Sequence, residues 1–164
     1  MNIFLLDFNP KLAAEYHCDK HLVKMILETA QLLYTCHWVI CPDGLPENAY
    51  KKCHMNHPCG IWVRESLANY TWLCELGKYL CEEYTVRYGK IHKTQAHLLW
   101  LMENPPTGLC DVGITEIRLA MPDKYKCANP VQAYRNFYIG SKLQERRIVK
   151  YTKREWPEFL KRFT

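Results

Sequence analysis

A two-sided helical pattern between residues 17 and 36 constrains the fold of this chain more than any other feature of its sequence. The opposite sides differ in polarity, and the spacings of 4, 3, 4, 3 and 4 on the polar side match helical periodicity. The polar side holds His17, His21, Lys24, Glu28, Gln31 and Thr35, and the mostly apolar side holds Leu22, Met25, Ile26, Thr29, Leu33 and Cys36. The pattern predicts a long helix that buries its apolar side in a core.

Capping and breaking residues extend this helical prediction over most of the chain. Asn9 and Pro10 favour a helix over 10–17, followed by a helix to about residue 39 that either continues it or starts again at Asp19. Further helices are expected at about 58–88, ended by Gly89, and at 94–102, 131–148 and 155–163, with irregular segments at 41–58 and 104–129. Residues 3–7 are apolar and β-prone. We therefore predict one mainly α domain over residues 1–164, with a short N-terminal β-strand or hairpin and a basic C-terminal helix.

Composition excludes several classes of protein. A chain of 164 residues with 48% hydrophobic and 24% charged residues can bury a core and is neither disordered nor collagen-like. No apolar run reaches the roughly 18 residues of a membrane span, and residues 1–7 lack signal-peptide features, so we expect no membrane partner. The nine cysteines form no C-x-x-C pair, which favours reduced thiols and a cytoplasmic location.

Basic residues are concentrated at the C-terminal end. Residues 142–164 hold eight of the 22 Lys and Arg residues but three of the 17 Asp and Glu residues, so they carry the whole net charge of +5. Such a segment is typical of proteins that bind a polyanion such as nucleic acid. The alternative is a solvated helix with a basic tail.

Two segments contain residue types that could carry chemistry. On the polar helix side, imidazoles, an amine and a carboxylate could supply a general acid/base pair or a nucleophile, unless this side is simply exposed and Lys24 pairs with Glu28. Residues 53–59, with the sequence CHMNHPC, could bind zinc together with His17 or His21. Their spacing matches no standard zinc pattern, so we expect no metal and no cofactor.

The start of the helix at Pro58 offers a further hypothesis. Unpaired backbone N–H groups there could bind an anion, with Lys51 and Lys52 just upstream and His57 at a phosphate or a reacting group. The alternative is a capped helix start with an ordinary surface histidine.

Aromatic and basic residues alternate later in the chain, a pattern suited to stacking on bases and holding phosphates, although aromatics at helical spacing are also typical of a core. Trp62 is one candidate for stacking. The full set that we predict to contact nucleic acid is Lys51, Lys52, Arg64, Arg87, Tyr88, Lys90, Arg135, Arg146, Arg147, Lys150, Lys153 and Arg154.

Several segments resemble a family of small proteins of large DNA bacteriophages and other large DNA viruses. They are YHCDKHLVKMILETAQLL at 16–33, NHP at 56–58, EYTVRYGK at 83–90, AMPD at 120–123 and AYRN at 133–136. This resemblance covers nearly the whole chain and implies a protein made in the cytoplasm of an infected cell.

A second resemblance is to the viral pyrimidine dimer DNA glycosylases, which are small, basic and mainly helical. It rests on LAAEY at 12–16 and on a helix opened by Asn-His-Pro. These enzymes attack the sugar with the amine of the mature N-terminus and use a glutamate shortly after the Glu-Tyr segment. Here Cys18 stands at that position, and Glu28 is the carboxylate that could substitute for it. Asn2 is bulky enough that we expect Met1 to be retained.

We therefore predict a DNA glycosylase with lyase activity and DNA as its partner. The amine of Met1 or of Lys24 would attack the sugar carbon, and Glu28, His17, His21 or His57 would move protons or contact the reacting group. Two alternatives remain. One is a non-catalytic viral accessory protein that docks on nucleic acid or a host protein, and the other is a small enzyme that acts on a free nucleotide.

Overall fold

The computed structural model describes residues 1–163 and is helical. The α-helices are α1 (Pro10–Tyr16), α2 (Asp19–Ile40), α3 (Pro58–Val63), α4 (Leu67–Tyr88), α5 (Gln95–Glu103), α6 (Pro130–Phe137) and α7 (Glu158–Lys161). A 3₁₀ turn, η1 (Asp123–Tyr125), precedes α6, and a π-helix, η2 (Tyr138–Glu145), continues it. No helix within residues 1–163 is long and apolar enough to cross a membrane.

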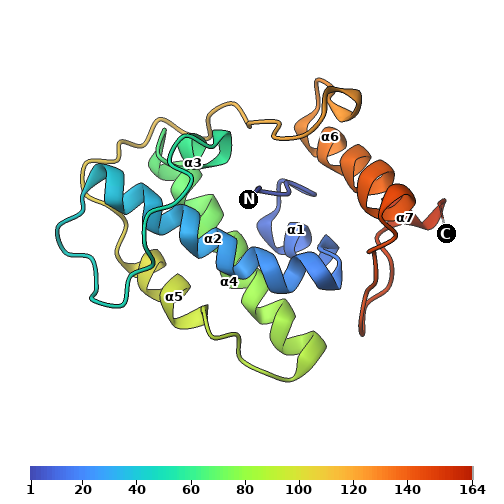
Figure 1. The fold of residues 1–164 in the computed structure, drawn as a ribbon, viewed down its shortest axis with the longest axis horizontal. Coiled ribbons are helices and arrows are strands. Elements are labelled where there is room, and N and C mark those ends of the chain that lie inside the picture. The colour runs from blue at the N-terminus through green and yellow to red at the C-terminus, as the bar shows by residue number, and fades with distance from the viewer. Residues whose placement is uncertain (164) are drawn as a thin grey trace.

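Helices α2 and α4 form the centre of the molecule (Figure 1). They bury apolar side chains such as Leu22 and Ile26 of α2 and Leu73 of α4. Gly77 of α4 allows a close approach of three helices, because a Cβ atom there would lie 2.8 Å from Leu98 of α5 and 3.1 Å from Thr29 of α2. The predicted apolar side of α2 is therefore confirmed as a core surface.

Local sequence explains where the first two helices begin and end. The Asn9 side chain accepts hydrogen bonds from the N–H groups of residues 11 and 12, and Pro10 is the first residue of α1. His17 and Cys18 are extended, so α2 starts anew at Asp19. Of the two predicted arrangements, the chain adopts the one with two separate helices.

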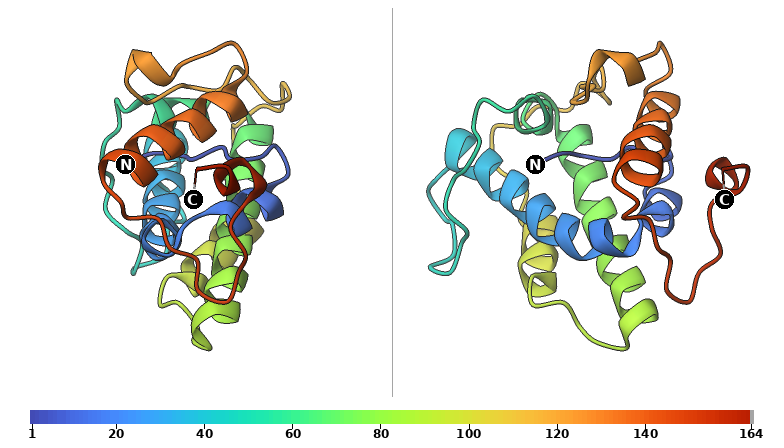
Figure 2. Two further views of the ribbon diagram at one scale, coloured as in Figure 1. Left: turned by 90° about the vertical axis from the view of Figure 1, so that its right-hand side faces the viewer. Right: turned by 45° about the vertical axis from the view of Figure 1, so that its right-hand side comes forward.

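The predicted N-terminal strand or hairpin is wrong, since no strand is present in residues 1–163. Residues 3–6 are buried, but they lie among helices rather than beside a second extended segment. Their backbone groups bond locally or to side chains: the N–H of Leu6 donates to the Phe4 carbonyl, and Arg135 donates to the Leu6 carbonyl. The two views in Figure 2 show this segment passing between the helices.

Three predicted helices also differ from those observed. The helix expected over 58–88 is interrupted, because Ser66 caps a new helix by accepting a hydrogen bond from the N–H of Ala68. The helix expected over 131–148 is α6 followed by the π-helix η2, and the terminal helix is the short α7. The basic C-terminal segment therefore contains more irregular backbone than predicted.

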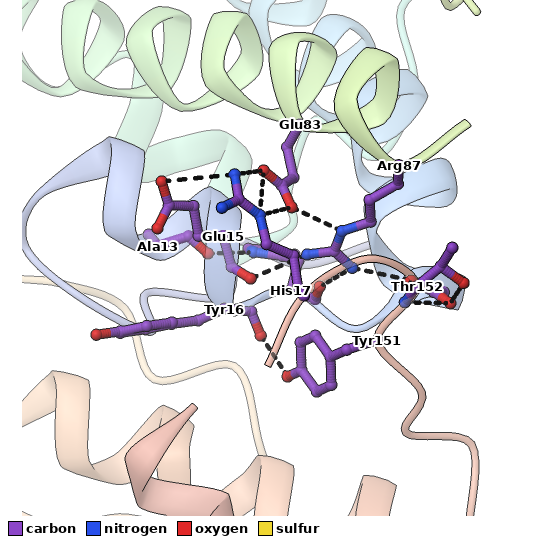
Figure 3. A network of polar contacts seen from close by, with 10 residues as sticks. Ala13, Glu15, Tyr16, His17, Glu83, Arg87, Tyr151 and Thr152 are labelled. Carbon is purple, nitrogen blue, oxygen red and sulfur yellow. Dashed lines mark hydrogen bonds and ion pairs between the residues drawn. The ribbon is translucent and has the colours of Figure 1, made fainter. Parts of the chain in front are cut away.

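A buried arginine ties the C-terminal segment to the helical core (Figure 3). The guanidinium of Arg87 donates to Glu83 at 2.7 Å, to Asp19 at 2.9 Å and to the carbonyls of Glu15 and His17 at 2.9 Å each. Arg154 donates to Glu83 at 2.7 Å. Burial alone would raise the pKa of Glu83, but hydrogen bonds from these two arginines outweigh it and lower that pKa.

Candidate active site

The N-terminal amine and the carboxylate of Glu28 form the centre of the candidate site. The nitrogen of Met1 lies 3.7 Å from Oε2 of Glu28, and Nζ of Lys24 lies 3.1 Å from Oε1. Glu28 is 8% exposed, and its Oε2 is a buried atom that accepts no hydrogen bond. Because buried carboxylate oxygens are normally hydrogen-bonded, this unpartnered oxygen beside an amine indicates a functional group rather than a structural one.

Helix α2 and residues 1–4 together create this arrangement. Glu28 and Lys24 lie one turn apart on the polar side of α2. Phe4 stacks on His21 with ring centroids 4.5 Å apart, one further turn toward the start of α2. The N-terminal segment therefore runs along the polar side of α2, and its amine reaches Glu28.

His57 lies near the same centre, at the start of α3. Its Nδ1 accepts a hydrogen bond from the N–H of Cys59, so the imidazole caps the helix. Burial lowers the pKa of His57, the positive charges of the Met1 amine and of His54 lower it further, and Glu28 opposes them. The structure thus brings His57 within electrostatic reach of the amine and Glu28, as a neutral imidazole at pH 7.

The two histidines of the polar side occupy different environments. His21 is 7% exposed, and its Nδ1 lies 2.6 Å from the Tyr138 hydroxyl of η2. Burial lowers its pKa to about 3, assisted by the neighbouring His17 ring and by the positive charges of Lys142, Lys24 and Arg146. His21 is therefore a neutral imidazole at the edge of the site.

His17 is fully buried and cannot contact a substrate directly. Its Nδ1 donates to the Ala13 carbonyl at 2.6 Å, and its Nε2 has no partner. Burial lowers its pKa to about 4. The turn between α1 and α2 buries the ring in the core, so the catalytic role of His17 stays a prediction and would have to act through another group.

Lys142 is a residue that sequence reasoning did not place in the site. Its ammonium lies 4.3 Å from the ring centroid of Phe137 and 5.8 Å from that of Phe4, and the residue is only 6% exposed. Burial lowers its pKa, and the positive charges of Arg146 and Lys24 add to this effect. The only sequence signal for Lys142 is its place at the start of the basic C-terminal segment.

The predicted nucleic-acid contacts divide into two groups. Of these predicted contacts, the basic side chains that are exposed and have no ion pair in residues 1–163 are Lys51, Lys52, Lys90, Arg146, Arg147, Lys150 and Lys153. Tyr88 is half-buried. Four other arginines bind protein groups: Arg64 donates to the carbonyls of Met55 and Gly60, Arg135 to Asp7 and the Leu6 carbonyl, and Arg87 and Arg154 to Glu83.

These contacts correct part of the prediction. Arg87 is 1% exposed and cannot reach a phosphate, and Arg64, Arg135 and Arg154 hold the fold together. Trp62 is 2% exposed, so it is a core residue rather than a stacking platform. Sequence spacing did not separate these residues from the exposed ones because it does not show which side chains the fold buries or pairs.

The cysteine and histidine segment at 53–59 is used for packing and capping. Cys59 is buried beside Asn2, and the N–H of Cys53 donates to the Thr35 hydroxyl. In the part of the chain that the structure describes, no group of three or more His, Cys, Asp or Glu side chains could hold a metal ion.

Comparison with known proteins gives one match. The family described as pyrimidine dimer DNA glycosylase matches residues 1–96, which is more than half of the chain and includes the amine of Met1, Glu28 and His57. Searches of curated proteins and of solved structures give no match. The chain belongs to the pyrimidine dimer DNA glycosylase family.

Proposed function

We propose that this protein is a DNA glycosylase with lyase activity that acts on pyrimidine dimers through the amine of Met1. The observation that carries the proposal is the ion pair between this amine and Oε2 of Glu28, 3.7 Å apart. This oxygen is buried and accepts no hydrogen bond. The family match supports the substrate class. Lys24 is the second candidate amine, because it lies 3.1 Å from the other oxygen of the same carboxylate.

The reaction follows from the chemistry of these two groups. The amine, as its free base, attacks C1′ of the damaged nucleotide, and the bond from C1′ to the base breaks with its electron pair leaving on the base. Glu28 accepts a proton from the attacking nitrogen and passes it to O4′ as the sugar ring opens, which gives an iminium ion beside the regenerated carboxylate. Loss of a proton from C2′ then breaks the bond from C3′ to its phosphate oxygen, and water releases the amine.

The environment of Glu28 suits this role. A carboxylate that is 8% exposed interacts with positive charge in a medium of low dielectric constant, where its stabilisation of the iminium ion is stronger than in water. The neutral imidazoles of His21 and His57 flank the centre without adding positive charge. They can accept or relay a proton, and His17 is left out of this role.

The exposed cations supply the attraction to DNA. Lys51 and Lys52 precede α3, and Arg146, Arg147 and Lys150 follow the π-helix. Each cation that neutralises a phosphate releases a counterion, so we expect binding to weaken steeply with salt.

The experiment that tests the proposal is borohydride trapping on duplex DNA that carries a thymine dimer or an abasic site. We expect a covalent adduct that peptide mapping assigns to Met1, formed equally well by the Lys24→Arg variant. An adduct assigned to Lys24 would move the nucleophile to that residue. Binding without any adduct or strand cleavage would reject the enzymatic proposal.

One observation favours a second candidate, a protein that binds DNA without turnover. The seven predicted contacts that are exposed basic side chains without an ion pair in residues 1–163 are sufficient for phosphate binding, whether or not the amine reacts. The trapping experiment separates the two, because a binder would show salt-dependent affinity alone.

We also propose that the protein acts in the cytoplasm of a cell infected by a large DNA virus. All nine cysteines are free in the structure, which supports a reducing compartment. Detection of the protein in infected-cell cytoplasm by immunoblotting of cell fractions would test this.

A further inference from the structure

The side chain of Asn2 is held by hydrogen bonds to three separate parts of the molecule. Its Nδ2 donates to the Ala120 carbonyl at 2.9 Å, while its Oδ1 accepts from the Tyr134 hydroxyl of α6 at 3.1 Å. The same oxygen accepts from the N–H of Ile3 at 2.8 Å and from Sγ of Cys59 in α3 at 3.5 Å. One short amide thus links the first residues to α3, to α6 and to the segment before η1.

The partner of this amide is itself rigidly held. Tyr134 is fully buried, and its hydroxyl lies 2.8 Å from the Arg118 carbonyl and 3.4 Å from the N–H of Ala120. Burial raises the pKa of Tyr134 far above its ordinary value, so the hydroxyl stays protonated and remains a donor. The contacts of Asn2 and Tyr134, which we call the clamp, therefore keep this donor at neutral pH, with its hydrogen shared between Asn2 and the Arg118 carbonyl.

Asparagine is the residue that these contacts require. Its amide offers a donor and an acceptor on a short side chain, whereas aspartate lacks the donor, leucine lacks both, and glutamine is longer by one methylene group. Asn2 directly follows Met1, whose backbone nitrogen is the amine. Since consecutive Cα atoms are about 3.8 Å apart, a change of one residue in the register would move the amine by a comparable distance from Glu28.

We propose that Asn2 is a positioning residue, which fixes the chain register so that the amine of Met1 faces Oε2 of Glu28. This inference rests on the proposed function, because it assigns Asn2 a role in presenting the proposed nucleophile. Phe4 supports the same register through its stacking on His21, but it lies further along the chain from Met1 than Asn2 does. Asn2 acts through Met1 and touches no reacting atom.

Asn2→Leu is the most direct test, because leucine has a similar size, removes both polar functions and is large enough for Met1 to be retained. Tyr134→Phe weakens the same clamp from α6 without changing residues 1–3. The matched control is Tyr151→Phe, which removes another buried hydroxyl, one that donates to the Tyr16 carbonyl at 2.6 Å. Intact-mass measurement confirms the N-terminus of each variant, and thermal unfolding confirms that each is folded.

Two measurements separate positioning from general loss of structure. The first is the single-turnover rate of adduct formation at saturating abasic-site duplex, with the Kd for the same duplex measured independently. We expect Asn2→Leu to lower the rate at least tenfold with Kd within twofold of wild type, Tyr134→Phe to lower it less, and Tyr151→Phe to leave it unchanged. The second is acetylation of the Met1 amine by an N-hydroxysuccinimide ester without DNA, which we expect to be faster in Asn2→Leu.

The outcomes also distinguish this inference from the function on which it rests. If wild type forms the Met1 adduct and Asn2→Leu forms it at the same rate, the positioning role is overturned and the proposed function stands. If wild type forms no Met1 adduct, both are overturned. If Asn2→Leu does not fold, Asn2→Asp and Tyr134→Phe take its place, and wild-type rates in both would overturn the inference.

Discussion

Replacement of Glu28 by glutamine tests the centre of the proposed mechanism. Glutamine keeps the size of the side chain but removes the negative charge 3.7 Å from the amine. With an effective dielectric constant of about 20, a full positive charge at this distance interacts with the carboxylate by about 4 kcal/mol. The iminium ion forms at this position, so its stabilisation is what the variant loses.

The expected effect on rate follows from this energy. A loss of about 4 kcal/mol corresponds to roughly a thousandfold, which lies within the range of about 10²- to 10⁴-fold for acid–base groups. We therefore expect Glu28→Gln to lower the single-turnover rate of adduct formation by about 100- to 1,000-fold. Some stability should be lost as well, because the buried Met1 amine loses its ion-pair partner, so unfolding is measured beside the rate.

The assay is borohydride trapping on abasic-site duplex at saturating protein, with thermal unfolding as the test of folding. The matched control is Glu82→Gln, which removes a carboxylate from an exposed ion pair of the same helical spacing, 3.8 Å from Lys78. A folded Glu28→Gln protein with a rate within threefold of wild type would refute the role of Glu28.

Three further predictions concern stability and DNA binding. Arg87→Met should lower the free energy of unfolding by about 3–5 kcal/mol in urea titration, because Asp19 loses its ion pair with Arg87 and Glu83 keeps only Arg154; a loss below about 1 kcal/mol would contradict this. His17 and His21, with pKa values lowered to about 4 and about 3, bind fewer protons folded than unfolded, so stability should fall as pH drops below 6.5 toward these values; replacing both by Gln should flatten the thermal-unfolding profile there. Arg147→Ala should reduce the slope of log affinity against log salt by about 1, and an unchanged slope would place Arg147 outside the interface.

The helical fold and the polar side of α2 could be predicted because both depend on local spacing. His21, Lys24 and Glu28 share one helix, so a period of 3.6 residues was enough to place them together. The position of the Met1 amine opposite Glu28 could not be obtained in this way, because it depends on long-range contacts of residues 2–4. The family resemblance supplied the amine as a candidate, and the structure supplied its partner.

The wrong predictions have a common physical cause. The apolar residues 3–6 have the composition of a strand, but a strand also needs a second edge, which their surroundings do not provide. Arg64 and Arg87 have the same local pattern as basic residues that bind DNA, yet carbonyls and carboxylates of the folded chain take up their hydrogen bonds. The local sequence shows which hydrogen bonds a side chain could make, but not which partner it has in the folded chain.

The contacts of Arg87 also show how the two ends of the chain depend on each other. The family match ends at residue 96, but Glu83 and Asp19 inside that region are completed by Arg154 and Thr152 from outside it. A gene fragment limited to residues 1–96 would encode the reacting groups while leaving these carboxylates short of donors. The C-terminal segment therefore supplies hydrogen-bond donors to two carboxylates of the matched region, and a chain without that segment would lose these contacts.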